Sequence, residues 1–247
     1  IFVLIVSIIS GALAGMLVTF IPGFLKVKFN ASELVTSLML NYIALNFGLY
    51  VIQGPFRDPE VNTMYSYKFP KGVDLGKIIT GTRIHYGLIL AIIAIFIANH
   101  AMKKTTFGYK TRLVGNNENM ANYSGINSAK IIIITQLVGG LIAGFGGAVE
   151  LFGMYDRFQY TELTGYGWDG ILIATVAKNN PSMVSIAAIF LAYIRVGASI
   201  MSRQTDVPFE IIQIVQAIII IFISADRLLK KYKSNILQKE INNTVDR

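Results

Sequence analysis

The sequence predicts an all-α fold: a polytopic transmembrane helical bundle with about seven spans, one of them short or broken. Composition is the first reason, because 53% of the 247 residues are hydrophobic and only 15% are charged. The mean hydropathy of +0.55 is typical of a membrane protein rather than a soluble domain. The second reason is a series of long uncharged runs. In lipid such runs form helices, because a helix pairs all of its own backbone amides.

Each span is placed where charged residues are absent for about twenty positions. Four spans are expected in the first part of the chain, at 1–21, 33–53, 84–102 and 131–154. A short or broken segment follows at 168–177, and then come spans at 182–202 and 209–225. The membrane domain therefore covers 1–226, and 227–247 form a basic tail. Because the chain starts inside an apolar run without an initiator Met, we expect part of its amino-terminal region to be missing.

The positions of Lys and Arg set the expected orientation, since cytoplasmic loops carry the excess of positive charge. With Arg195 set aside as intramembrane, the two sides of the expected bundle hold 14 and 7 of these residues. The richer side includes the loop after the third span and the basic tail, so both are expected in the cytoplasm. The long loop 54–83 is expected outside. This orientation requires the segment 168–177 to cross the membrane. If the segment only enters the membrane and returns to the same side, the directions of the last two spans are reversed.

Small residues inside the spans predict close helix packing. The small-xxx-small spacing, which lets helix backbones approach closely in lipid, occurs at Gly11 and Gly15 and again at Gly140 and Gly144.

Polar side chains inside the spans are candidates for solute contact, because they are costly in lipid unless they are paired or face water. Each could make an interhelical hydrogen bond, or it could line a path for a neutral solute. The candidates for the path are Asn41, Asn46, Gln136, Asp169, Gln213 and Gln216. For Arg195, which interrupts the span at 182–202, a structural ion pair with Glu150 or Asp169 is favoured over contact with an anionic solute.

Several chemistries are disfavoured by the residues present. The chain has no cysteine and only two histidines, so we expect no metal site and no catalytic triad. The run GYGWDG at 165–170 matches G-x-G-x-x-G but follows a membrane span rather than a strand, and there is no P-loop. The basic residues are not interleaved with aromatic residues, so no nucleic-acid partner is expected. We interpret the net charge of +8 as a topology signal and, in the tail, as contact with anionic membrane lipid.

The polar stretch FGYKTRLVGNNENMANYSGI at 107–126 separates two long apolar runs. It contains a basic flank, a turn rich in Gly and Asn, and a short helix-sized piece that ends at Gly125-Ile126. A solvated loop is one interpretation. The other is a cytoplasmic segment on which a partner acts during transport.

Four blocks, in the same order, resemble the permease subunits of bacterial ABC importers, in the branch related to branched-chain amino acid permeases that serves nucleosides and simple sugars. SELVTSLMLNYIA at 32–44 is similar to N-E-x-x-x-T-L-M-L-N-Y-I-A, and GNNENMANYSGI at 115–126 is similar to G-x-N-x-x-A-A-x-Y-A-G-I. GGLIAGFGGA at 139–148 is similar to S-G-A-L-A-G-L-A-G-A, and GYGWDGILIATVAKNNP at 165–181 to G-x-G-F-x-G-I-A-V-A-L-L-G-R-N-N-P. Met120, Ser124 and Glu118 depart from the loop pattern.

The resemblance implies that the loop docks on a separate cytoplasmic ABC ATPase, which would carry ATP and Mg²⁺, and transmits its movement. The residues that match the family's loop pattern are Gly115, Asn117, Ala121, Tyr123, Gly125 and Ile126. It also implies a second permease subunit, identical or related, and an external substrate-binding lipoprotein. This chain would have no catalytic site or cofactor of its own. Its location would be the bacterial cytoplasmic membrane, with a cytoplasmic carboxyl terminus.

The expected solute is a nucleoside, with a simple sugar such as a pentose as the nearest alternative. A branched-chain amino acid permease is a second alternative, which would need sites for an ammonium and a carboxylate. An ATP-independent channel or secondary transporter is a third, which would need no ATPase. The sequence leaves these alternatives open.

Overall fold

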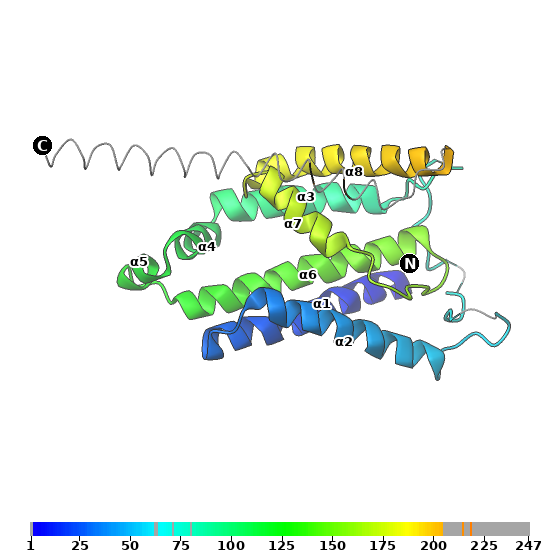
Figure 1. Cartoon of the computed structure of the whole chain (residues 1–247), viewed down its shortest axis with the longest axis horizontal. Coiled ribbons are helices and arrows are strands. Elements are labelled where there is room, and N and C mark those ends of the chain that lie inside the picture. The colour runs from blue at the N-terminus through cyan, green and yellow to red at the C-terminus, as the bar shows by residue number, and fades with distance from the viewer. Residues whose placement is uncertain are drawn as a thin grey trace, which may run out of the picture. The chain divides into compact units, whose positions relative to one another are not determined.

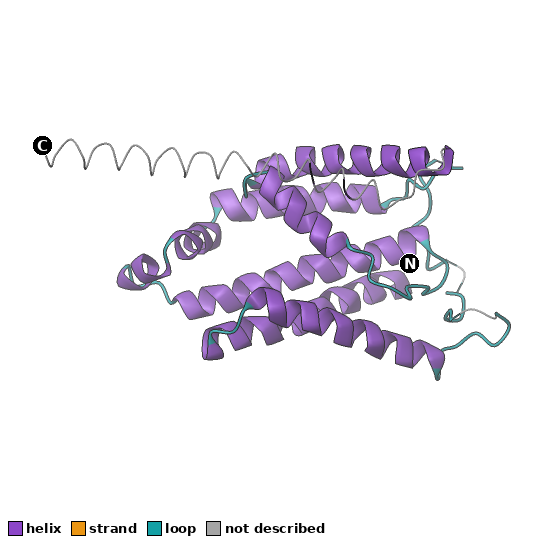
Figure 2. Ribbon diagram, viewed as in Figure 1, coloured by secondary structure: helices purple, strands orange, loops and turns teal. Residues whose placement is uncertain are grey.

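The computed structural model describes residues 2–61, 64–70, 72–79 and 81–204, together with positions 214 and 218. The described elements are all α-helices, accompanied by two isolated β-bridges (Figure 2). The predicted all-α fold is therefore confirmed. Among the described residues, α1, α2, α3, α6 and α8 are long and apolar enough to cross a membrane.

The chain divides into a first unit over 1–164 and a second unit that starts at Gly165. The first unit contains α1 (Phe2–Phe29), α2 (Glu33–Gln53), α3 (Gly87–Lys104), α4 (Thr106–Asn116), α5 (Glu118–Tyr123) and α6 (Ser128–Met154) (Figure 1). The second contains α7 (Tyr166–Val176) and α8 (Pro181–Gln204). The expected spans agree with these helices to within a few residues, except at the end of α1. The span predicted at 209–225 and the tail lie outside the described residues, apart from Ile214 and Ile218.

The prediction that the first helix ends at residue 21 is wrong. α1 continues for about two more turns to Phe29, with Pro22 inside it. Proline removes one backbone donor, but Gly23 beside it packs against Gln136 of α6, whose Cβ would lie 3.3 Å from a Cβ added to the glycine. Packing against a neighbouring helix therefore holds this part of α1, which the local sequence signal does not reveal.

The most extensive helix contact in the first unit joins α1 and α6, which run antiparallel. Gly11 lies against Ala148, and Gly15 lies against Gly144 and Gly140. A Cβ added to Gly15 would come within 2.8 Å of the Cα atom of Gly144, so any side chain there would force the helices apart. The predicted packing role of these glycine pairs is confirmed.

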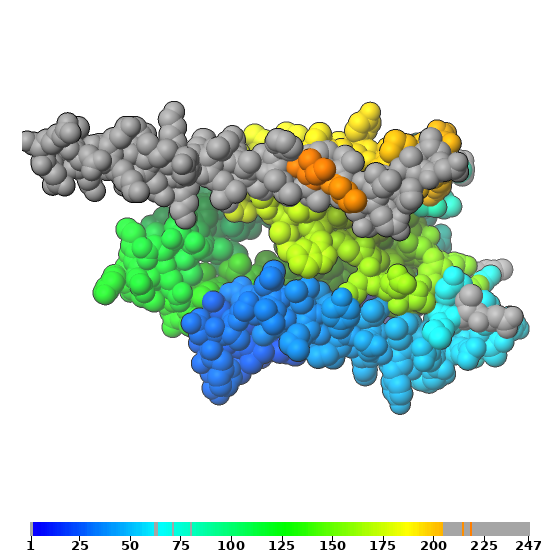
Figure 3. Space-filling view, viewed as in Figure 1, coloured from blue at the N-terminus to red at the C-terminus, as the bar shows by residue number. Residues whose placement is uncertain are grey.

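The helix ends of the first unit gather into two groups. One group contains the end of α1, the start of α2, the end of α3, α4, α5 and the start of α6; the other contains the loop 54–86 and the end of α6. Figure 3 shows α4 and α5 in green at one end of the unit and the loop in cyan at the other. Among the described residues of this unit, the two sets of Lys and Arg that the charge rule assigns to opposite sides of the membrane therefore lie at opposite ends.

The loop 54–86 is folded onto the carboxyl end of α6. The backbone N–H of Leu75 donates to the carbonyl of Phe152 (2.9 Å), and that of Phe69 donates to the carbonyl of Asp156 (2.8 Å). Arg157 and Asp58 form an ion pair (3.4 Å) whose side chains are only 13% and 12% exposed. The described parts of the loop thus form a cap on the end of α6.

The second unit begins with a short helix followed by a tight turn. The 11 residues of α7 rise about 16 Å, roughly half of the hydrocarbon thickness, so the prediction of a short helix is confirmed. Lys178 and Asn179 both adopt left-handed backbone conformations, with φ of 53° and 56°. The side chain of Asn180 then accepts from the backbone N–H of Ser182 (3.2 Å) at the start of α8.

We predict that Gly15→Leu destabilises the protein by about 3 kcal/mol, because the new side chain overpacks the α1–α6 contact. Thermal unfolding of the detergent-solubilised protein measures the change. Gly139→Leu is the matched control, since a Cβ on Gly139 meets nothing within 4 Å. Equal unfolding temperatures for the two variants would contradict the assigned contact.

Candidate functional site

The polar stretch between α3 and α6 folds into two short helices. Thr105 caps α4, its side chain accepting from the backbone N–H of Gly108 (3.2 Å). The guanidinium of Arg112 donates to the carbonyl of Met102, which ties α4 to the last turn of α3. The sequence analysis expected only a basic flank here and missed this helix. The signal that could have found it is Thr105, a favoured N-cap residue.

Four residues of the predicted loop pattern build the two ends of α5. Asn117 is its N-cap, and its side chain accepts from the backbone N–H of Met120 (3.0 Å). At the other end, Ile126 donates to the carbonyl of Ala121 (3.0 Å), and Gly125 donates to the carbonyl of Asn122 (3.0 Å). These bonds form a Schellman motif, which requires the left-handed φ of 77° that Gly125 adopts. These residues of the loop pattern therefore set where α5 begins and where it ends.

The two sides of α5 differ sharply in exposure. Ala121 is completely buried, whereas Tyr123 is 92% exposed and Met120 is 57% exposed. Met120 and Tyr123 are three residues apart and therefore share one face of the helix. Gly115, near the end of α4, is exposed, and a Cβ added there would meet nothing within 4 Å. Met120 was noted in the sequence only as a departure from the family pattern.

A buried serine fixes α5 to the start of α6. The hydroxyl of Ser128 donates to Oε1 of Glu118 (3.0 Å), and its backbone N–H donates to Oδ1 of Asn122 (3.2 Å). Ser128 is only 5% exposed. Because both bonds join one helix to the first turn of the next, α5 and α6 are held as one body. The sequence analysis did not identify this clamp.

Further along, α6 is joined to α4 and α2 by polar side chains. Thr135 lies 3.4 Å from Thr111 of α4, oxygen to oxygen. Gln136 donates to the carboxylate of Glu33 at the start of α2 (2.9 Å). These residues line a cavity of about 260 Å³ beside Gly115. The segment of α4 and α5 (106–123), which the function proposed below makes the coupling segment, is therefore connected through α6 to α2, a helix long and apolar enough to cross a membrane.

The residues expected along a solute path lie on different elements. Asn41 and Asn46 are exposed on α2, and Asn46 donates to the carbonyl of Tyr42 in its own helix (2.8 Å). Gln136 is paired with Glu33 rather than with either asparagine. Asp169 is on α7 in the second unit. Gln213 and Gln216 lie outside the described residues.

The ion pair expected for the arginine inside α8 is present, with one of the two partners that the sequence left open. Arg195 of α8 forms an ion pair with Asp169 of α7. Its guanidinium carbon also lies 5.7 Å from the ring centre of Tyr166. Since a lone charge in lipid is costly, this pairing lowers the cost of placing both groups inside a membrane.

Comparison with known proteins identifies the family. The model of the family described as "Branched-chain amino acid transport system / permease component" matches residues 2–224. The chain belongs to this family. Permeases of this family are membrane transport components, and the long apolar helices of the structure are those of a multi-pass membrane protein.

Three curated relatives align with most of the chain. Guanosine ABC transporter permease protein NupP of Bacillus subtilis is 33% identical over 96% of the chain and 69% of its own length. Glucose ABC transporter permease protein TsgB13 of Haloferax volcanii is 29% identical, over 92% of the chain and 63% of the relative. Nucleoside ABC transporter permease protein NupB of Lactococcus lactis is 31% identical over 90% of the chain and 64% of its own length. The permease thus spans about two thirds of these relatives. No solved structure gives a significant match.

Proposed function

We propose that the chain is the permease subunit of an ABC importer that carries nucleosides across the cytoplasmic membrane of a bacterium. The observation that carries this proposal is the likeness to NupP over nearly the whole chain, together with the loop pattern that becomes the capped helix α5. The permease itself makes no covalent change in the solute. ATP and Mg²⁺ bind to a separate ATPase.

Nucleosides are preferred as the solute because two of the three relatives described above are named for them. The relative named for glucose keeps a simple sugar as the second candidate. None of these three names refers to an amino acid, although the family description does. All three are named as ABC transporter permeases, which argues against a channel that works without ATP.

The coupling segment is the proposed contact with the ATPase. Its outermost helix presents Met120 and Tyr123 to solvent, and exposed aromatic and Met side chains are enriched at protein interfaces. The clamp at Ser128 would carry a push on α5 directly into α6. In this proposal the end of the unit that holds α4 and α5 is cytoplasmic, as is the basic tail.

The remaining partners act at other surfaces. An external substrate-binding lipoprotein would deliver the solute to the side that carries the loop 54–86. A second permease subunit, either related or a copy of this chain, would complete the transport path.

Cells that express the complete transporter are expected to take up labelled guanosine, and cells that lack this permease are expected to lose that uptake. Unlabelled adenosine should compete, whereas leucine should not. Competition by glucose or ribose instead of adenosine would favour the sugar candidate. Guanosine uptake that does not depend on the permease gene would overturn the nucleoside proposal.

Tyr123→Ala is expected to reduce co-purification of the ATPase with the permease by about fivefold or more, because truncation of an exposed aromatic anchor weakens an interface by about 1 kcal/mol or more. Tyr67→Ala is the matched control, since Tyr67 is also exposed but belongs to the loop at the opposite end of the unit. Uptake should fall in parallel in Tyr123→Ala. Full retention of the ATPase by this variant would refute the docking role of α5.

A further inference from the structure

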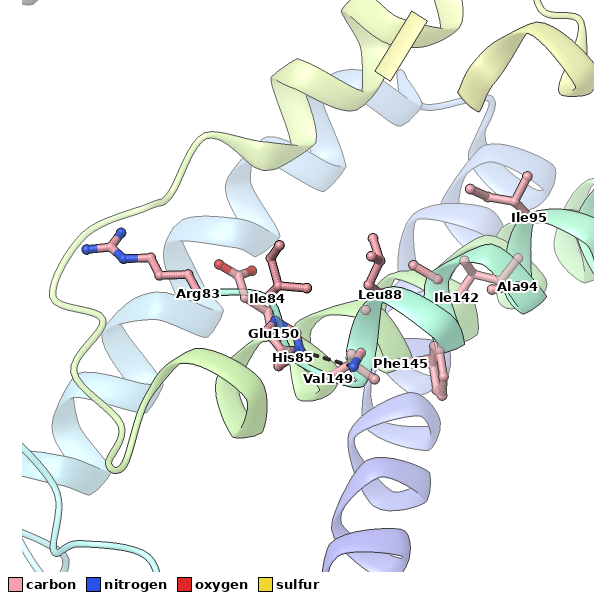
Figure 4. A pocket seen from close by; sticks show the side chains of 13 residues that line it. Arg83, Ile84, His85, Leu88, Ala94, Ile95, Ile142, Phe145, Val149 and Glu150 are labelled. Carbon is pink, nitrogen blue, oxygen red and sulfur yellow. Dashed lines mark hydrogen bonds between the residues drawn. The ribbon is translucent and has the colours of Figure 1, made fainter. Parts of the chain in front are cut away.

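A groove lies between α3 and the second half of α6, outside the coupling segment and the solute path expected from the sequence. Its volume is about 510 Å³, within the range of small-molecule sites. Figure 4 shows Leu88 and Ala94 of α3 on one side of it, and Phe145 and Glu150 of α6 on the other. The groove opens at the end of the unit that carries the loop 54–86, because Arg83 and His85 of that loop form its rim.

Small residues on the facing surfaces of α3 and α6 leave the space that forms the groove. Gly87, Ala91 and Ala94 recur at helical spacing along α3, and Gly146 faces them from α6. A Cβ added to Gly146 would meet nothing within 4 Å, so this glycine is not needed for packing between the helices. The opposite side of α3 instead carries exposed large residues such as Ile93.

The rim of the groove is polar although its walls are apolar. Glu150 lies one turn before the end of α6, and among the described residues the structure gives its carboxylate no hydrogen bond or ion pair. Arg83 shares the rim, but its guanidinium points away from that carboxylate (Figure 4). A carboxylate without a charged partner is costly in lipid, so it faces water or the interior of a bundle. The groove is therefore expected to face water or solute rather than lipid.

His85 is held rigidly at this rim. Its Nδ1 accepts from the backbone N–H of Gly87 (3.1 Å). The ring also lies against Gly153, where an added Cβ would come within 2.7 Å of the imidazole Cγ. Glycines on both α3 and α6 thus accommodate the ring, which fixes the separation of the two helices where the groove opens.

We propose that this groove is a nucleoside-binding site, with the ribose hydroxyls at Glu150 and the base between the apolar walls near Phe145. A carboxylate accepts two hydrogen bonds from adjacent hydroxyl groups, and such charge-assisted bonds are strong. Phe145 offers an aromatic surface to a planar base. A simple sugar is polar on all sides and would leave hydroxyls unpaired against Leu88, Ile95 and Ile142. The inference rests on the proposed nucleoside import and names the site that selects its solute.

Access to the groove is tested by cysteine labelling, for which the chain offers a cysteine-free background. In the complete transporter, Ala91→Cys is expected to react with a membrane-impermeant methanethiosulfonate reagent added outside, and saturating guanosine should slow that reaction at least about fivefold. Ile93→Cys, on the opposite side of α3, is the matched control and should gain no protection. Absence of labelling at Ala91→Cys, or labelling that guanosine does not slow, would overturn the proposal.

Recognition of the ribose is tested by the ratio of KM for 2′,3′-dideoxyguanosine to KM for guanosine. In the unmodified transporter this ratio should be about tenfold or more, because a site built for hydroxyl groups rejects an analogue without them. Glu150→Gln should bring the ratio close to one, whereas Glu60→Gln, in the outer loop, should leave it unchanged. Gly146→Leu should block uptake by filling the groove, and Gly139→Leu should not.

These measurements separate the two proposals. If the unmodified transporter takes up no guanosine, nucleoside import itself is wrong. If it takes up guanosine and the ratio is the same in Glu150→Gln, only the assignment of the groove is wrong.

Discussion

The contact between α1 and α6 is the constraint on which the first unit depends. Glycines on both helices let the backbones touch, and a side chain at Gly15 would separate them. Once α6 is fixed in this way, every other described element of the unit attaches to it directly or through a neighbour. α5 attaches through Ser128, α4 through Thr135, and α2 through Gln136. The loop 54–86 attaches at the opposite end through backbone hydrogen bonds to Phe152 and Asp156. A single long helix thus connects the two ends of the unit.

Through these contacts, a movement that begins at the α5 end of the unit could be transmitted to the other helices. In the proposed function, a push on α5 would reach α6 directly, because the Schellman motif at Gly125 and the clamp at Ser128 join the two helices. It would then reach α2 through the bond between Gln136 and Glu33, and α1 through the glycine contact. At the far end the same helix carries Glu150 and the wall of the groove.

Much of this fold could be predicted from the sequence, because long uncharged runs and the spacing of small residues are strong signals in membrane proteins. The bounds of α2 follow from these signals, and the cost of an unpaired charge predicts an ion pair for Arg195, although not whether its partner is Glu150 or Asp169. The extension of α1 beyond Pro22 does not follow from the sequence, because it depends on the contact between Gly23 and Gln136, which is 113 positions away. The hydrogen bonds of Ser128 and the groove beside Glu150 also arise only when the helices are packed. Four residues of the loop pattern build the ends of α5 in the structure, whereas Met120 and Tyr123 form its exposed face, and the role of these residues in docking stays a prediction.

The proposed role of α5 is that of a cytoplasmic lever moved by a separate ATPase, and the side of the membrane on which α5 lies tests this proposal most directly. A single cysteine at Asn119, which is exposed on α5, can be labelled with a membrane-impermeant maleimide. The account predicts strong labelling in inside-out vesicles and none in right-side-out vesicles until they are permeabilised. Labelling in sealed right-side-out vesicles would place α5 outside the cell, where no ATPase could act on it, and would contradict the account.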